Sequence, residues 1–141
     1  MEDLMSVRVT DRKEGRLQIL EKSRLLLDYT YDKITSDKVY PKSVRWLLPK
    51  NIWEHAQAAD ACIDLANAIK VENAADLQKR RTLQKDAWGH LKHLERLVDL
   101  SYRKKYLSAD QTEFWIRMIL DARSALSAWM KSDKERYKGL T

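Results

Sequence analysis

The amino-acid sequence predicts an all-α fold, an antiparallel up-down-up-down four-helix bundle. Its 141 residues are 44% hydrophobic and 34% charged but include only three glycines and two prolines, a composition typical of compact, helix-rich domains. Apolar residues recur at helical spacing in four segments, and no segment shows the period-two alternation of a half-buried strand. The connections between these segments are short, which favours antiparallel neighbours around one core.

The first helix is expected over about residues 15–35. Its apolar stripe consists of Leu20, Leu27, Tyr31 and Ile34. We expect this stripe to face the core. Residues 1–14 are mostly polar, and we interpret them as an N-terminal arm that precedes the bundle of residues 15–132.

The second helix is expected over about residues 43–70, with two prolines near its start. Pro41 requires an extended residue before it, and Ser43 can then cap the helix. Pro49 lacks the N–H group of an interior helical residue, so the helix either bends at Pro49 or begins near it. We expect the neighbouring Trp46 to leave the helical stripe and to close over the end of the bundle.

The third helix carries most of the net positive charge. Asn73 followed by Asp76 fits an N-cap, and the helix that it starts ends near Lys105. Residues 73–106 contain nine basic and four acidic residues, so they supply +5 of the net charge of +6. This surplus indicates either an anionic partner or a solvated helix face, and both interpretations stay open.

Five basic residues of this helix fall on one line, opposite its apolar side. This basic stripe consists of Arg81, Lys85, Lys92, Arg96 and Arg103. It extends over roughly 33 Å at 1.5 Å per residue, long enough to follow several phosphates of a nucleic acid. Further candidate phosphate contacts are Lys104, Lys105, Arg45 and Lys50. Trp88, on the flank of the stripe, either stacks on a base or packs at the core margin.

The fourth helix is expected to begin with Ser108 and Gln111, which fit a capping box, and to end at about Lys131. Its apolar stripe consists of Trp115, Met118, Ile119, Ala122, Leu126 and Trp129. Residues 133–141 are polar, and we interpret them as a C-terminal tail.

Apolar residues outside the main stripes indicate a homo-oligomer. On the second helix, Trp53 projects nearly opposite the main apolar face, next to Gln57. Ile116 and Leu120 on the fourth helix also lie off the main stripe. A helix that is apolar on two sides is usually covered on two sides, so we expect these four residues to form an oligomer interface.

The sequence predicts no catalytic residue, no metal site and no cofactor. Asp86, His90 and His93 share one helix, and Asp60 and Asp64 are spaced by one helical turn. Carboxylate-bridged di-metal bundles need Glu-x-x-His motifs from two helices, and this sequence has none. It also lacks a glycine-rich phosphate loop and a Gly-x-Ser-x-Gly elbow. We interpret His90 as a hydrogen-bonded core histidine.

The cysteine content and the hydropathy predict a cytoplasmic protein. Cys62 is the single cysteine, so no internal disulfide can form, which indicates a reducing compartment. No stretch approaches the roughly 18 consecutive apolar residues of a membrane span. The first residues are acidic where a signal peptide is basic. We therefore expect no membrane partner.

The segment YPKSVRWLLPKNI, residues 40–52, resembles a signature that opens the second helix of the accessory variability determinant proteins of diversity-generating retroelements. Related four-helix proteins encoded in ribosomal RNA intervening sequences share it. The matching residues are Tyr40, Pro41, Lys42, Ser43, Arg45, Trp46, Leu48 and Ile52. The pattern differs at Pro49, where the family usually has glycine, and at Asn51, where a basic residue is common.

A second similarity covers residues 94–132, which begin LERLVDLSYRKKYLS and end SALSAWMKS. They resemble the family's leucine-rich third helix, a Leu-Ser turn and a fourth helix that closes on a Leu-x-x-Trp pair, here Leu126 and Trp129. Ala128 stands where a glycine often precedes the final tryptophan.

The resemblance implies an adaptor that does no chemistry. Members of the family form small basic bundles that assemble as ring-like homopentamers, bind reverse transcriptase and its template RNA, and are needed for mutagenic copying of a variable region. For this chain it implies a reverse transcriptase partner and binding of RNA or an RNA–DNA hybrid. Two other interpretations stay open: an intervening-sequence protein of unknown role, and a structural oligomer without a nucleic acid partner.

Overall fold

The computed structural model describes the backbone of residues 4–140 and the side chains of residue 16 and residues 18–140. This part of the chain contains no strand and has four α-helices and two short 3-10 helices. The α-helices are α1 (Leu4–Ile34), α2 (Leu48–Ala68), α3 (Ala74–Arg103) and α4 (Ala109–Arg136). The 3-10 helices are η1 (Lys42–Val44) and η2 (Lys138–Leu140). The prediction of an all-α fold with four helices is confirmed for these residues.

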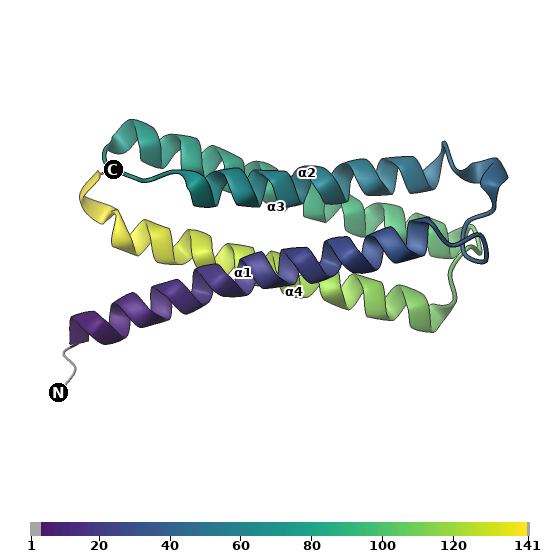
Figure 1. Ribbon diagram of the computed structural model, residues 1–141, viewed down its shortest axis with the longest axis horizontal. Helices are drawn as coiled ribbons and strands as arrows, with labels where there is room; N and C mark the ends of the chain where they lie inside the picture. The colour runs from purple at the N-terminus through teal and green to yellow at the C-terminus, as the bar shows by residue number, and fades with distance from the viewer. Residues whose placement is uncertain (1–3, 141) are drawn as a thin grey trace.

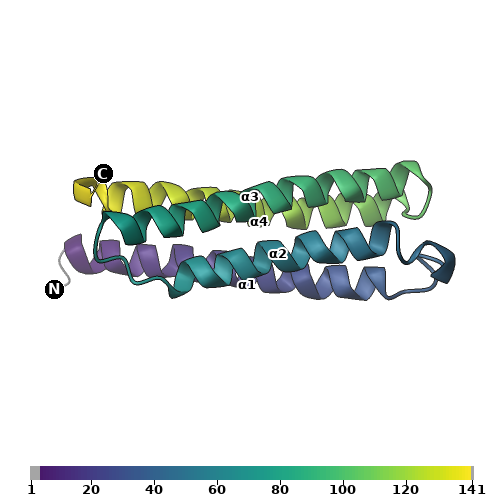
Figure 2. The same ribbon diagram turned by 90° about the horizontal axis from the view of Figure 1, so that it is seen from above.

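The four helices lie side by side along the long axis of the molecule (Figure 1). Helices α1 and α3 each contact both α2 and α4. Figure 2 shows two layers, with α1 and α2 in one and α3 and α4 in the other. The α1–α2 and α3–α4 connections lie at one end of the bundle, and the α2–α3 connection lies near the C-terminus at the other end.

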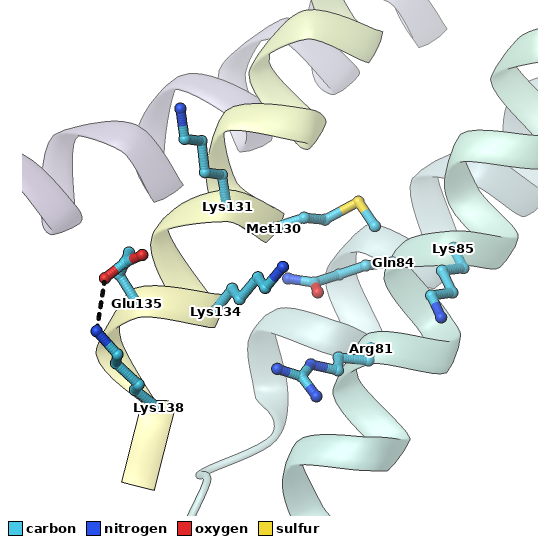
Figure 3. A pocket seen from close by; sticks show the side chains of 8 residues that line it. All are labelled: Arg81, Gln84, Lys85, Met130, Lys131, Lys134, Glu135 and Lys138. Carbon is cyan, nitrogen blue, oxygen red and sulfur yellow. Dashed lines mark ion pairs between the residues drawn. The ribbon is translucent and has the colours of Figure 1, made fainter. Parts of the chain in front are cut away.

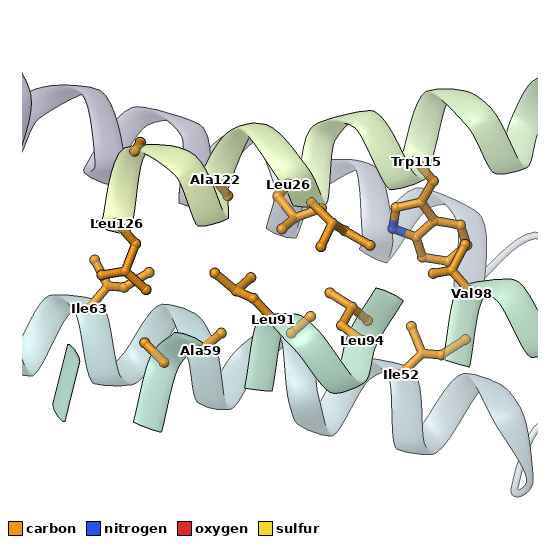
Figure 4. Close-up of a cluster of buried hydrophobic side chains, with 14 of the residues drawn as sticks. Leu26, Ile52, Ala59, Ile63, Leu91, Leu94, Val98, Trp115, Ala122 and Leu126 are labelled. Carbon is orange, nitrogen blue, oxygen red and sulfur yellow. The ribbon is translucent and has the colours of Figure 1, made fainter. Parts of the chain in front are cut away.

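Apolar side chains from all four helices fill the space between the layers (Figure 4). Those labelled in Figure 4 are Leu26, Ile52, Ala59, Ile63, Leu91, Leu94, Val98, Trp115, Ala122 and Leu126. Two of the three predicted caps, at Asn73 and Ser108, are confirmed. Asn73 Oδ1 accepts from the Asp76 N–H at 2.9 Å, and Ser108 forms a capping box with Gln111. These side chains satisfy N–H groups that have no partner within the helix.

The core face of α1 is rotated from the predicted stripe. Leu20 and Leu27 are half-buried and Tyr31 is exposed. Among the residues of α1 whose side chains the structure describes, the buried ones are Ile19, Ser23, Leu26 and Thr30. Two of them are polar, and both have partners on neighbouring helices: Ser23 Oγ donates to Asp60 Oδ1 at 2.8 Å, and Thr30 Oγ1 accepts from Trp115 Nε1 at 3.2 Å. A polar side chain can enter the core where such a hydrogen bond satisfies it.

Helix α2 begins at Leu48 rather than at Ser43, and Pro49 lies in its first turn, where a missing N–H costs nothing. Of the two arrangements considered for Pro49, the structure therefore has the helix start. Ser43 lies in η1 and does not cap α2. Trp46 is 75% exposed, so the prediction that it closes the end of the bundle is wrong.

Tyr40, just before η1, is buried instead of Trp46. Its hydroxyl donates to Ser101 Oγ at 2.8 Å, and Ser101 Oγ donates to the Leu97 carbonyl at 3.0 Å. Its ring centroid lies 5.7 Å from that of Tyr106. Burial raises the pKa of Tyr40 to about 12, and the hydrogen bond with Ser101 opposes this shift. This network joins the α1–α2 connection to the end of α3.

The helices extend beyond the predicted bundle of residues 15–132 at both ends. Helix α1 begins at Leu4, so most of the predicted arm, residues 1–14, is helical, while residues 1–3 lie outside the described part. Helix α4 continues to Arg136, so the predicted tail, residues 133–141, begins within a helix. The physical reason at this end is Asp133, a charged residue that is only 3% exposed.

Asp133 forms a buried ion pair with Arg80 of α3. Arg80 Nε lies 2.8 Å from Asp133 Oδ2, and Arg80 Nη2 donates to Asp133 Oδ1 at 3.2 Å. The Nε contact is a close charge pair without the alignment of a hydrogen bond. Gln84 Nε2 donates to Asp133 at 2.9 Å, and Arg80 Nη1 donates to the Ile69 carbonyl at 3.3 Å. The Arg80 guanidinium also lies 4.8 Å from the ring centroid of Trp129. One arginine thus joins α3, α4 and the α2–α3 connection.

Neutralising Asp133 should strongly destabilise the fold. We expect Asp133→Asn to lower the free energy of unfolding by about 3–5 kcal/mol, because it leaves the Arg80 charge buried and uncompensated. The double variant Arg80→Met/Asp133→Asn should recover most of this loss, because it removes both charges and keeps an acceptor for Gln84. Urea unfolding followed by circular dichroism measures both. Equal stability of the two variants would contradict the role of the ion pair.

Candidate nucleic-acid interface

The basic stripe lies on the outer side of α3. Lys85, Lys92 and Arg96 are exposed and Arg81 is half-buried, while the opposite side of the helix is buried in the core. Arg81, Lys85, Lys92 and Arg96 have no ion-pair partner among the described residues. Arg103, the last residue of the stripe, pairs with Asp99 at 3.0 Å. The cations without a partner therefore occupy about the first two thirds of the stripe, from Arg81 to Arg96.

The other predicted phosphate contacts differ in how far they are neutralised. Arg45 pairs with Asp37 at 3.6 Å, and Lys50 pairs with Glu54 at 3.9 Å. Lys50 Nζ also lies 5.6 Å from the ring centroid of the exposed Trp46.

Lys104 and Lys105 are exposed in the turn that ends α3. Lys105 has a φ of 70°, the left-handed conformation that usually falls to glycine at this position. Two groups of predicted phosphate contacts therefore lie outside the stripe. Lys104 and Lys105 directly follow α3, whereas Arg45 lies just before α2 and Lys50 lies in its first turn.

A groove of about 720 Å³ lies between α3 and the end of α4 (Figure 3). Its lining residues are Arg81, Gln84 and Lys85 from α3, and Met130, Lys131, Lys134, Glu135 and Lys138 from the C-terminal part of the chain. Five of these eight residues are basic and one is acidic. The acidic residue, Glu135, pairs with Lys138 at 4.0 Å. We name this the basic groove.

Sequence reasoning missed the α4 side of the basic groove. Lys131 and Lys134 lie one turn apart on α4, a signal that the sequence contains. The signal was overlooked because the fourth helix was expected to end at about Lys131, which left Lys134 in the predicted tail.

A second, smaller hollow of about 350 Å³ adjoins the basic groove. It is lined by Lys85, Trp88, Ser127 and Met130, and therefore shares Lys85 and Met130 with the groove. Trp88 is 37% exposed. The Arg123 guanidinium lies 5.2 Å from its ring centroid and is itself held by Glu95 at 2.6 Å. Trp88 thus lies at the edge of the core with an accessible part of its ring beside the stripe.

The residues of the predicted oligomer interface lie in both layers of the bundle. Trp53 of α2 packs edge-on against Tyr31 of α1 at 5.7 Å between ring centroids, and Gln57 is exposed. Ile116 of α4 lines a third hollow with Lys92 and Arg96 of α3, and Leu120 is 39% exposed. The two pairs therefore do not form one continuous patch.

The three histidines of the chain lie together between α2 and α3. His55 Nδ1 lies 3.0 Å from His90 Nδ1, and the ring centroids of His55 and His93 are 4.5 Å apart. Burial, and then the charges of His93 and His90, lower the pKa of His55, while Glu54 opposes the shift. His90 is thus half-buried and hydrogen-bonded to another histidine.

The other residues considered for chemistry do not form a constellation. Among the residues that the structure describes, no group of three or more His, Cys, Asp or Glu side chains is placed to hold a metal ion. Asp60 accepts the hydrogen bond from Ser23. Cys62 is half-buried, and burial, followed by the charge of Asp86, raises the pKa of its thiol above the usual value.

Comparison of the chain with protein-family models, curated proteins and solved structures finds no match. None of the helices in residues 4–140 combines the length and the apolar character needed to cross a membrane.

Acid should weaken the fold through His55. Because the folded state lowers the pKa of His55, the unfolded state binds the proton more readily, so stability falls as the pH drops through about 6.5. We expect a lower urea midpoint at about pH 5.5 than at about pH 7.5, a range in which ordinary carboxylates remain ionised. His55→Gln, which cannot be protonated, should flatten this dependence. A wild-type midpoint that does not change between these pH values would contradict it.

Proposed function

We propose that this protein is a non-catalytic accessory protein of a diversity-generating retroelement. It acts in the cytoplasm as a basic, oligomeric adaptor that binds the element's reverse transcriptase and its template RNA or the RNA–DNA hybrid. The observation that carries this proposal is the row of exposed cations along α3, which have no ion-pair partner among the described residues. Its central members are Lys85, Lys92 and Arg96.

The chemistry of the row suits a phosphate backbone. Cations without a protein partner can neutralise phosphates, and this neutralisation releases counterions condensed on the nucleic acid, which adds to the affinity. Contacts from lysine and arginine to phosphate oxygens carry no sequence information, so this contact tolerates any sequence. An adaptor that holds a template during copying needs that tolerance.

Two of the residues that carry the resemblance to the retroelement family, Tyr40 and Trp129, are buried at opposite ends of the bundle. Tyr40 is buried and bonded to Ser101 near one end of the bundle. Trp129 is buried against Arg80 near the other. These residues therefore have structural roles that a family signature would preserve. The short connections and the course of the chain in Figure 1 favour the antiparallel up-down-up-down arrangement.

The separation of the two pairs of predicted interface residues favours a ring. Trp53 and Gln57 belong to the α1–α2 layer, whereas Ile116 and Leu120 belong to the α3–α4 layer. A closed ring needs two different surfaces on each subunit, one for each neighbour. The pentameric number rests on the family resemblance alone.

A separate exposed surface suits a protein partner. Trp46 and Leu47 are 75% and 64% exposed, and Arg45 and Lys50 lie beside them in the chain. Exposed aromatic and basic residues are frequent anchors of protein interfaces. We assign this surface, at the end of the bundle opposite the basic groove, to the reverse transcriptase.

Removing three cations of the stripe tests the proposal. In Lys85→Gln/Lys92→Gln/Arg96→Gln, RNA affinity should fall, and the log-log slope of affinity against salt should decrease by about one for each lost phosphate contact. Fluorescence anisotropy across a salt series measures both quantities. The matched control is Arg24→Gln/Lys38→Gln/Lys79→Gln, which removes the same charge from exposed positions outside the stripe. Equal affinity and slope in the two triple variants would contradict phosphate binding by the stripe.

The oligomer is tested separately. Light scattering at micromolar concentration should give a multiple of the 16.6 kDa chain mass. Leu120→Glu should reduce this mass while the helical circular dichroism stays unchanged, because it places a charge on a partly exposed apolar position. A wild-type mass of one chain would contradict the oligomer.

A further inference from the structure

The basic groove has positively charged side chains from two helices on its two sides. The stripe has positively charged side chains from α3 alone. Arg81 and Lys85 belong to α3, and Lys134 belongs to α4. Figure 3 shows Arg81 and Lys134 pointing from opposite walls into the groove. A phosphate that enters it meets donors on both sides, whereas a phosphate on the stripe meets donors on one side.

Four of the five positive charges of the groove are not neutralised by the protein. Arg81, Lys85, Lys131 and Lys134 have no ion-pair partner in the described part of the chain. Like charges gathered around one groove repel each other, and a bound anion relieves that repulsion. The electrostatics of the groove therefore favour an anionic ligand.

One of the residues that line the groove, Gln84, has a buried hydrogen-bond acceptor that receives no hydrogen bond. Gln84 is fully buried, and its Nε2 is committed to Asp133, which fixes the orientation of the amide. Its Oε1 has no hydrogen-bond partner. The flexible side chains of Met130 and Lys134 line the groove beside it. A ligand donor, such as a ribose hydroxyl or an exocyclic amine, reaches Oε1 when these side chains move aside.

An aromatic surface lies next to the charged part of the groove. The hollow that contains Trp88 shares Lys85 and Met130 with the groove, and Trp88 follows Lys85 by three residues, roughly 4.5 Å along the helix axis. A base attached to a phosphate in the groove can therefore reach the exposed part of the Trp88 ring. Base stacking on aromatic side chains is tolerant of sequence because every base has a π face.

We propose that the basic groove binds a nucleotide of single-stranded RNA, with its phosphate between Arg81, Lys85 and Lys134 and its base against Trp88 and Met130. This inference rests on the proposed function, because it specifies which form of nucleic acid the protein holds. The bases of a duplex are stacked on each other and do not reach Trp88, so the groove selects unpaired template.

The experiment compares ligands with and without bases. Wild-type protein is titrated with a short oligouridylate and with a ribose-phosphate oligomer of the same length that carries no bases. Wild-type protein should bind the oligouridylate about tenfold more tightly, the effect of a stacked base. Trp88→Ala should abolish this difference, and Trp88→Phe, which keeps an aromatic ring, should retain most of it. Retention by the phenylalanine variant separates stacking from a folding defect.

The phosphate contacts are tested by Arg81→Gln/Lys134→Gln, which removes one cation from each wall. It should weaken binding of both oligomers and lower the salt slope by about two. The matched control, Arg24→Gln/Lys38→Gln, should leave both affinities within about twofold of wild type, because these exposed residues lie outside the groove.

The outcomes separate this inference from the proposed function. Equal wild-type affinity for the two oligomers, or an unchanged preference in Trp88→Ala, overturns the nucleotide site even if the stripe variants lose RNA binding. If Arg81→Gln/Lys134→Gln behaves like its control, the groove does not hold the phosphate. If Lys92→Gln/Arg96→Gln, which leaves every lining residue of the groove intact, retains full affinity while Arg81→Gln/Lys134→Gln loses it, the stripe beyond the groove fails and the groove stands.

Discussion

The buried ion pair between Arg80 and Asp133 is the interaction on which the arrangement of α3 and α4 most depends. Two charges that are each about 4% exposed are stable only with close geometry and further hydrogen bonds, and both conditions are met here through Gln84 and the Ile69 carbonyl. A small shift of α4 along α3 would separate the charges in a place that water does not reach. The pair therefore fixes the distance between the two walls of the basic groove.

A second polar contact fixes the opposite end of the bundle. Tyr40 and Ser101 hold the α1–α2 connection against α3, and the apolar core lies between this contact and the ion pair. Hydrophobic packing alone is weakly directional, whereas a buried hydrogen bond is lost by a shift of about one ångström. The candidate binding residues are thus carried on long helices whose relative positions are fixed at both ends, which suits the phosphate binding that we propose.

Much of the fold could be read from the sequence because its signals are local. The caps at Asn73 and Ser108 and the basic stripe depend on residues within a few turns of one helix, and the structure places them as expected. The burial of polar residues in the core was not predicted, because it depends on partners far away in the sequence. Thr30 is buried only because Trp115 donates to it, and Asp133 only because Arg80 meets it. The groove was missed for the same reason, since its two walls come from different helices.

Arg80 and Arg81 show how neighbouring residues of one type acquire different functions. They are separated by about 100° around α3, so Arg80 points toward the core and Arg81 toward the basic groove. Asp133 forms an ion pair with Arg80, and Glu135 forms one with Lys138. No other carboxylate is among the residues that line the groove. The nearby carboxylates of Asp133 and Glu135 are therefore paired with other residues, and the positive charges of Arg81, Lys85 and Lys134 remain uncompensated. A site for an external phosphate requires such uncompensated positive charge.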